Sequence, residues 1–247
     1  MLKLICCNVF MREACLAIAS SPHVVDPEFT ELGEHARSEG LRTLLQSRID
    51  AAETCGKTYE AILLLFGLCG NSTVGLQARS TQLVIPRAHD CCTILLGSRQ
   101  KFVQHFGDAP STPFSSCGYL ERSDYFLRTS DDGQTTIATG AGDGYKELVE
   151  KYGEEDAKFI WEQMHPQHDG NKKAVFIELP ETAHLGHADR FRSKATEAGK
   201  ELVVLNGNLQ LIRSLIHGQW PAEDFLIVPP GRSIDGVYDH DQIIRVK

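Results

Sequence analysis

Residues 59–71 read YEAILLLFGLCGN, and this stretch decides the fold. A short, uninterrupted apolar run bounded by polar residues and glycine is typical of a strand that is buried on both faces, as in a parallel sheet covered by helices. The run ends at Phe66, and Cys69 follows on a turn between Gly67 and Gly70. The stretch therefore predicts a buried parallel strand whose carboxyl end carries a thiol.

Apolar runs of the same kind recur along the chain and alternate with stretches of helical periodicity. The expected strands are 2–10, 59–67, 81–88, 173–179, 201–207 and 224–231, and the expected helices are 12–20, 35–53, 91–107, 145–153, 154–164, 184–199 and 209–218. This alternation predicts an α/β fold of two Rossmann-like lobes, each with a parallel sheet flanked by helices. We expect an N-terminal lobe over 1–107, a connecting segment or hairpin over 108–142, and a C-terminal lobe over 143–247.

The composition excludes several classes of protein. The chain has 247 residues, 42% of them apolar, and a net charge of −8, which disfavours nucleic acid and anionic membranes as partners. The sequence has no apolar run near the roughly 20 residues that span a bilayer, and its N-terminus lacks the pattern of a signal peptide. We expect a cytoplasmic protein that acts on a small molecule.

The cysteines are concentrated in the first half of the chain. There are eight of them: Cys6, Cys7, Cys15, Cys55, Cys69, Cys91, Cys92 and Cys117. A reducing cytosol favours metal ligation, catalysis or unpaired thiols over disulfides. Their uneven distribution predicts one site that uses cysteine rather than a set of structural cross-links.

Three expected strand ends each supply a thiol: ICCN ends the first strand, GLCGN the second, and PRAHDCC the third. The carboxyl ends of parallel strands lie at one edge of a sheet, so these loops should lie within reach of one another. Successive side chains of a strand point to opposite faces, so only one of Cys6 and Cys7 can face such a site. The alternative for any single thiol is packing in the core.

Three thiolates suit two occupants. An iron–sulfur cluster of the 4Fe-4S type held by three cysteines keeps one iron open for substrate, and zinc with three protein ligands also keeps an open position. Soft ligands disfavour magnesium and calcium. Arg87, His89 and Asn71 stand beside the thiols and are candidates for substrate contact. His89 as a fourth ligand would instead close the site, and residues 87–90 can also be a turn in which Asp90 caps the next helix.

Several motifs together resemble an uncharacterised bacterial and archaeal family of unknown function. They are GLCGN, LVIPRAHDC, LLGSRQKF and LVEKYGEEDAKFIWE, and the similarity extends through DFLIVPPG. The resemblance implies that Cys7, Cys69 and Cys91 are the ligands. It also implies an association with corrinoid-dependent methyl-transfer systems. The sequence departs from the family at SSCGYLERSD, where Tyr119 stands near a position at which the family tends to have tryptophan.

Together these observations predict a metal enzyme that acts on a small sulfur- or oxygen-containing molecule by elimination or desulfuration. The site logic is similar to that of quinolinate synthase and thiouracil desulfidases, where three cysteines hold a cluster. The alternatives are a zinc-thiolate methyl-transfer protein and a non-catalytic accessory protein of a corrinoid methyltransferase system.

Other cysteines and histidines are expected to lie outside the site. Cys15 should pack in the core, and Cys55 and Cys117 should lie in turns that tolerate serine. His184 and His187, three residues apart, lack an obvious third ligand and are interpreted as surface residues at a helix start.

Overall fold

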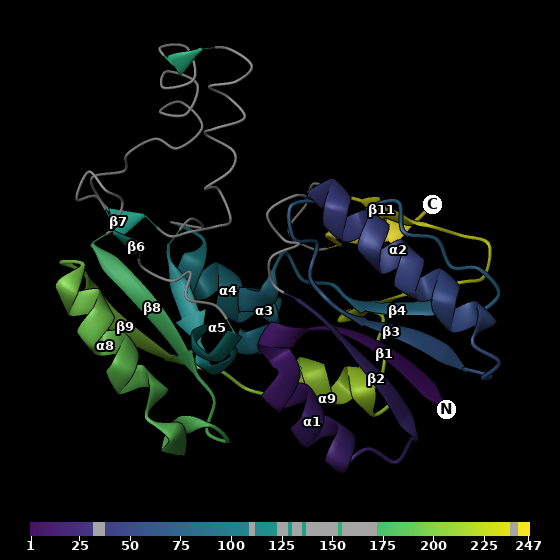
Figure 1. Ribbon diagram of the computed structural model, residues 1–247, viewed down its shortest axis with the longest axis horizontal. Helices are drawn as coiled ribbons and strands as arrows, with labels where there is room; N and C mark the ends of the chain where they lie inside the picture. The colour runs from purple at the N-terminus through teal and green to yellow at the C-terminus, as the bar shows by residue number, and fades with distance from the viewer. Residues whose placement is uncertain are drawn as a thin grey trace.

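The structure, a computed structural model, describes residues 1–31, 38–108, 112–122, 128–129, 135–136, 153–154, 172–237 and 242–247. Two main sheets lie side by side, each flanked by helices (Figure 1). The predicted α/β fold with parallel sheets is confirmed. None of the helices in these ranges is both long and apolar enough to cross a membrane.

The larger sheet contains the expected first strands and has the order β10-β4-β3-β1-β2. Its strands are β1 (Leu2–Cys7), β2 (Val25–Thr30), β3 (Ala61–Leu65), β4 (Leu83–Pro86) and β10 (Phe225–Val228). β1 to β4 are parallel, and β10 pairs antiparallel with β4. β2 was not predicted, because its sequence VDPEFT is only partly buried and contains a proline, which a sheet accepts at its edge.

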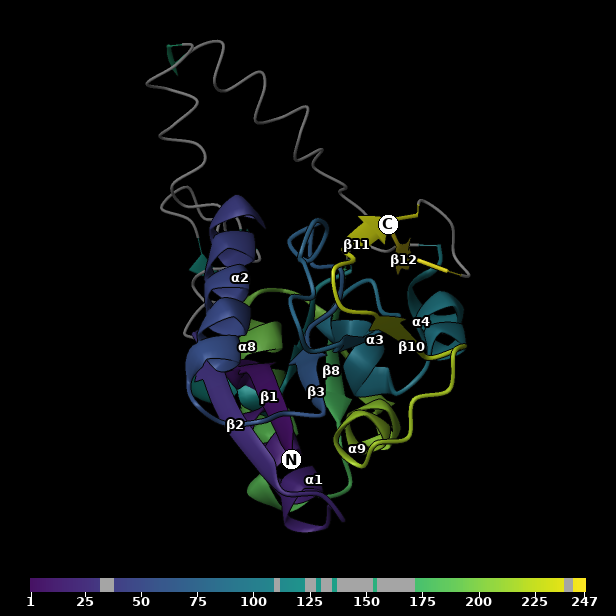
Figure 2. The same cartoon turned by 90° about the vertical axis from the view of Figure 1, so that its right-hand side faces the viewer.

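Helices cover both faces of this sheet. α1 (Met11–Ala19) and α9 (Gln210–Ile216) pack against each other on one face, and α2 (Ser38–Thr54) covers the other (Figures 1 and 2). The strand order explains why helices lie on both faces. The chain moves outward from β1 to β2 and then returns past β1 to β3, so the two crossovers run in opposite directions. Because both crossovers are right-handed, their helices lie on opposite faces of the sheet. The order therefore reverses between β1 and β3.

The smaller sheet is parallel and has the order β5-β8-β9. Its strands are β5 (Phe114–Ser116), β8 (Lys173–Glu178) and β9 (Glu201–Asn206), and α8 (His187–Glu197) packs against it after the short helix η3 (Ala183–Leu185). The predicted helix over 91–107 is two helices, α3 (Cys91–Leu96) and α4 (Arg99–Phe106). They are separated at Gly97, whose left-handed backbone ends α3, while Ser98 caps α4.

Two short strand pairs complete the described elements. They are β6 (Arg128–Thr129) with β7 (Thr135–Thr136), and β11 (Ile234–Gly236) with β12 (Ile244–Val246). Most of the expected connecting segment 108–142 and of the expected helices over 145–164 lies outside the described residues, and the predicted division into lobes stays a prediction. The C-terminal part of the chain nevertheless contributes the strand β10 to the larger sheet, and its helix α9 packs against that sheet.

A short helix joins the ends of the two sheets. α5 (Cys117–Arg122) follows β5 directly and packs on η1 (Asn8–Phe10), the turn that follows β1. Gly118 makes this possible: a Cβ atom there would lie 1.7 Å from the carbonyl oxygen of Val9. The carboxyl end of β5 therefore meets the carboxyl end of β1.

We predict that Gly118→Ala lowers the free energy of unfolding by about 1–3 kcal/mol or more, since the added methyl group overlaps backbone and forces α5 away from η1. Chemical denaturation measures the loss. Gly199→Ala is the control, because its Cβ would meet open space and its cost is limited to the left-handed backbone. A loss for Gly118→Ala no larger than for Gly199→Ala would contradict the close contact.

Candidate functional site: a buried cluster of thiols

The thiols expected at a common sheet edge flank the point where the strand order reverses. Cys7 ends β1, and Cys69 lies on the loop that follows β3, the neighbouring strand. Loops that leave adjacent strands at such a reversal diverge to opposite faces, which opens a crevice where α/β proteins bind their ligands. The topology thus places Cys7 and Cys69 at the most favourable ligand-binding position of the larger sheet.

The loop after β3 has an unusual backbone. Cys69, Gly70 and Asn71 follow one another with φ of 46°, 62° and 68°, all in the left-handed region. This conformation costs residues with a side chain about 1–2 kcal/mol each, and such strain is concentrated at functional sites. The Cys69 carbonyl oxygen accepts hydrogen bonds from the Ser72 backbone N–H (3.2 Å) and hydroxyl (2.7 Å), which hold the turn.

The loops after β3 and β4 are joined to each other. The backbone N–H groups of Leu68 and Cys69 donate to the carbonyl oxygens of Ala88 (2.8 Å) and His89 (2.9 Å). Gly67 permits this approach, since a Cβ atom there would lie 2.7 Å from the Asp90 backbone. Asp90 caps α3 by accepting from the Thr93 N–H at 3.0 Å, as expected, and Cys91 is the first residue of that helix.

Cys7, Cys69 and Cys91 come together with a tyrosine. The Cys69 and Cys91 side chains form a hydrogen bond, and both thiols interact electrostatically with Cys7. The buried Tyr119 hydroxyl also forms a hydrogen bond with Cys91 and is close enough to interact with the other two thiols. We call Cys7, Cys69 and Cys91 the thiol cluster. Tyr119 comes from α5, so the smaller sheet contributes to the site.

The adjacent cysteines are placed differently. Cys6 donates to the Cys7 carbonyl oxygen at 3.1 Å and is buried in the core, and Cys92 is fully buried within α3. Cys7 and Cys91 are among the groups that raise the pKa of both Cys69 and Tyr119. The structure therefore brings together the three thiols that the resemblance selects. Their role as ligands stays a prediction.

Two of the three thiols, Cys7 and Cys69, are held in their neutral form. Burial and the proximity of Cys91 raise the pKa of Cys7 far above its ordinary value, and the hydrogen bond with Cys91, burial and the neighbouring thiols do the same for Cys69. Asp90 also raises the pKa of Cys69. A nucleophilic cysteine needs a lowered pKa, so these thiols fit metal ligation, in which a bound cation removes the proton.

The three residues proposed for substrate contact differ in their surroundings. The Arg87 guanidinium donates to backbone carbonyl oxygens of Ala222 (2.8 Å), Gln242 (2.9 Å) and Ile244, and so ties the C-terminal segments to the end of β4. The His89 ring lies 6.0 Å from the Phe102 ring. Asn71 belongs to the left-handed turn beside Cys69. Substrate contact by Arg87, His89 and Asn71 remains a prediction.

Two predictions about other cysteines were wrong. Cys15 is exposed on α1, because Ala14 and Ala17 face the core in its place, and Cys117 is buried at the start of α5 rather than in a turn. Cys55 is exposed after α2, as expected. Tyr119 was not predicted as a neighbour of the three thiols, since α5 is a single short helix without a visible periodicity.

Buried polar atoms near the strand ends lack partners. In the described ranges, Asn8 Oδ1, Ser115 Oγ and Ser116 Oγ are buried without a hydrogen bond. Asn8 follows Cys7, and the two serines precede α5. Buried polar groups in proteins are normally paired, so unpaired ones beside a candidate site are available to a ligand.

The fold and this cluster define an α/β protein in which three cysteines lie near one another at the carboxyl edge of the larger sheet. The chain belongs to the DUF1638 family of proteins of unknown function, whose model matches residues 29–216. The matched range includes Cys69, Cys91 and Tyr119, whereas Cys7 precedes it. No curated protein and no solved structure is significantly similar to the chain.

We predict that Gly70→Ala destabilises the protein by about 1–2 kcal/mol, because the left-handed backbone disfavours a Cβ although the space is open. It should also speed the reaction of a thiol reagent with Cys69. Gly231→Ala is a matched control, since it has φ of 77° and open space but lies far along the chain on the loop after β10. Equal thiol reactivity in the two variants would contradict a role for the turn in holding Cys69.

A buried carboxyl group lies near this edge of the sheet. Glu13 of α1 is fully buried, and in the described part of the chain neither of its oxygens has a hydrogen-bond partner. Burial raises the pKa of Glu13 to about 7, and Glu121 contributes to the rise while Arg12 opposes it. A raised pKa in the folded state means that folding opposes ionisation, so the protein loses stability as the pH rises from about 4.5 through about 7.

We predict that Glu13→Gln stabilises the protein relative to wild type by an amount that grows with pH. The difference should approach about 3 kcal/mol above pH 7, the free energy that corresponds to such a pKa shift. Urea denaturation between about pH 5 and 8, with a chelator present, measures it. Glu197→Gln, at an exposed side chain, is the control. A difference that stays constant with pH would contradict the raised pKa.

Proposed function

We propose that the protein is a metal-dependent enzyme whose thiol cluster holds an iron–sulfur cluster with one coordination position open. The observation that carries the proposal is the proximity of Cys7 at the end of β1, Cys69 on the loop after β3, and Cys91 at the start of α3, beside the point where the strand order reverses. Three thiolates leave one iron of a 4Fe-4S cluster without a protein ligand.

The surroundings of the thiols fit this occupant. Cys7 and Cys91 are buried and Cys69 is partly buried. The pKa values of Cys7 and Cys69 are raised, and a bound cation would stabilise their thiolates. Sulfur ligands favour iron or zinc over magnesium and calcium. Gly70 leaves open space beside Cys69, since a Cβ atom there would have no other atom within 4 Å. When bound, the open iron would supply a Lewis acid for an oxygen or sulfur atom of the substrate.

The residues of the chain supply the proton chemistry. Burial, Cys91 and Cys7 raise the pKa of Tyr119 well above its ordinary value, so its hydroxyl stays protonated at neutral pH and can donate to a leaving oxygen or sulfur atom. Elimination breaks a carbon–oxygen or carbon–sulfur bond, the electron pair leaves on the heteroatom, and the neighbouring carbon loses a proton. Desulfuration exchanges sulfur for the oxygen of water and releases hydrogen sulfide. Neither reaction needs an oxidant or a reductant.

Metal analysis of the protein purified without oxygen tests the proposal. We predict iron and inorganic sulfide in wild type, and the loss of both in Cys7→Ser, Cys69→Ser and Cys91→Ser, each still folded. Cys55→Ser, at an exposed thiol, should keep both. Cys6→Ser and Cys92→Ser should also keep them but lose about 1–3 kcal/mol of stability, because each buries a hydroxyl in the core.

The remaining outcomes are equally informative. A Cys69→Ser variant with its full complement of metal would contradict the three-thiol site. Stoichiometric zinc without sulfide would exclude the iron–sulfur cluster and favour a zinc-thiolate methyl-transfer protein. Co-purification with a corrinoid methyltransferase, unchanged by the loss of a ligand cysteine, would favour the accessory protein without chemistry of its own.

A further inference from the structure

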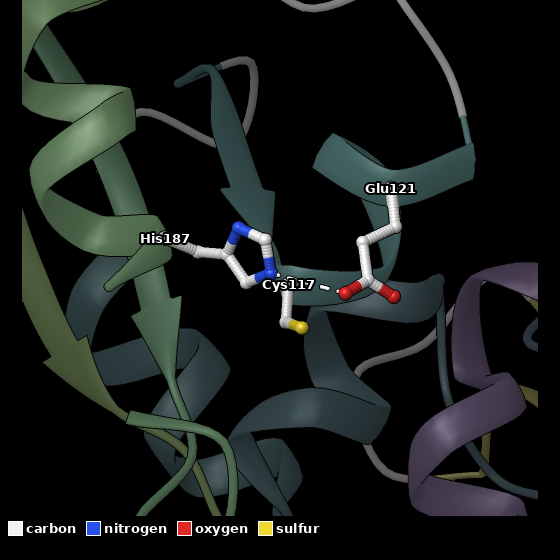
Figure 3. A group of neighbouring side chains, drawn as sticks. All are labelled: Cys117, Glu121 and His187. Carbon is white, nitrogen blue, oxygen red and sulfur yellow. Dashed lines mark hydrogen bonds and ion pairs between the residues drawn. The ribbon is translucent and has the colours of Figure 1, made fainter. Parts of the chain in front are cut away.

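A second group of metal-ligand side chains lies on the other side of α5. Cys117 Sγ, a carboxylate oxygen of Glu121 and a ring nitrogen of His187 all lie within 4.8 Å of one another. Figure 3 shows the three side chains pointing toward a common centre, Cys117 and Glu121 from α5 and His187 from α8. None of them belongs to the thiol cluster.

The local structure explains this convergence. Cys117 and Glu121 are four residues apart on α5, so they share a face, whereas Tyr119 between them points toward the thiol cluster. Cys117 follows the end of β5, and His187 begins α8 shortly after β8, the adjacent parallel strand. The three residues therefore lie at the carboxyl edge of the smaller sheet, where α/β folds bind their ligands.

The distances are close to those of a coordination shell. His187 Nε2 lies 3.1 Å from Glu121 Oε1. The bond lengths of tetrahedral zinc, about 2.0–2.3 Å, place neighbouring ligand atoms roughly 3.4–3.6 Å apart. The separation between His187 and Glu121 lies near this range, and the Cys117 Sγ atom lies within 4.8 Å of both, so an ion could enter with shifts of about an ångström. Cys117 and His187 are buried, with relative exposures of 2% and 8%.

The group also contains unsatisfied buried atoms. In the described part of the chain, His187 Nδ1 and both oxygens of Glu13 are buried without a hydrogen-bond partner. Glu13 is fully buried and interacts electrostatically with Cys117 and with Glu121. The carboxyl group of Glu13 thus lies close enough to interact with Cys117 and Glu121. Burying carboxylates together costs folding free energy unless a cation compensates their charge.

The cation that now faces the group is easily displaced. Arg12 forms an ion pair with Glu121, its Nε lying 2.9 Å from Oε1 and 2.8 Å from Oε2. The Arg12 side chain is 45% exposed, against 19% for Glu121, so it can turn to solvent at small cost. The carboxylate would then be available to a metal ion.

We propose that Cys117, Glu121 and His187 form a second metal site, which binds a divalent transition metal, zinc in the first place, with one position left for water or for Glu13. Sulfur, nitrogen and carboxylate ligands in one site are typical of zinc and disfavour magnesium and calcium. The ion would connect α5 to α8 and hold the helix that carries Tyr119.

Zinc titration of the full chain tests the site. The reduced protein is freed of metal with a chelator, and zinc alone is added in competition with a coloured chelator to give the number of sites and their affinities. His187→Gln is compared with His184→Gln, an exposed histidine three residues away. Cys117→Ser is compared with Cys55→Ser. Glu121→Gln keeps its shape and gives a third variant should Cys117→Ser fail to fold.

We expect each ligand variant to lose one equivalent of zinc or to bind it more than about 100-fold more weakly. Mutation of residues that only contact the ligands already lowers metal affinity by about 10- to 100-fold, so the loss of a ligand should cost more. The control variants should bind as wild type does. Zinc at the thiol cluster would survive all three ligand changes, so the two sites are told apart. Arg12→Gln should bind zinc more tightly, because the competing guanidinium is gone. Equal binding by His187→Gln and His184→Gln would overturn the proposal and leave an ion-pair cluster only.

Discussion

The contact between α5 and η1 is the constraint on which both candidate sites depend. Because Gly118 lets the backbone of α5 rest on the Val9 carbonyl group, the carboxyl edges of two separate sheets meet at one helix. Tyr119 reaches the thiols of the larger sheet from that helix, and Cys117 and Glu121 meet His187 of the smaller one. A single short element therefore sets the position of side chains on both sides of it.

Burial gives the thiols their chemical character. Cysteines in a reactive site are usually exposed to a positive environment that keeps them ionised. Here burial and the neighbouring thiols favour the neutral form of Cys7 and Cys69. The left-handed backbone at Cys69 adds a local cost that packing alone does not require. A bound metal accounts for both features, and this is why we place it ahead of nucleophilic catalysis.

The sequence predicted those parts that depend on local pattern. β1, β3, β4, β8 and β9 are recognisable because each is a continuous apolar run. The rule for parallel strand ends led us to expect Cys7, Cys69 and Cys91 near one another, and in the structure they are close enough to interact electrostatically. β2 was missed because Pro27 and exposed polar residues hide an edge strand. The pairing of His187 with Glu121, 66 residues apart, depends on tertiary structure that no local pattern contains. The same is true of β10, whose apolar run gives no sign of which sheet it joins.

The position of β10 has a consequence for how the chain folds during synthesis. β4 is complete once residue 86 has been made, but its partner strand begins at Phe225, and the carbonyl groups that Arg87 binds at 242 and 244 follow later still. Until then β4 is an unpaired edge strand with apolar side chains. Strands of other chains can form hydrogen bonds with such an edge, which leads to aggregation. Such long-range closure slows folding. In a cell, this protein would therefore depend on chaperones more than its size alone implies.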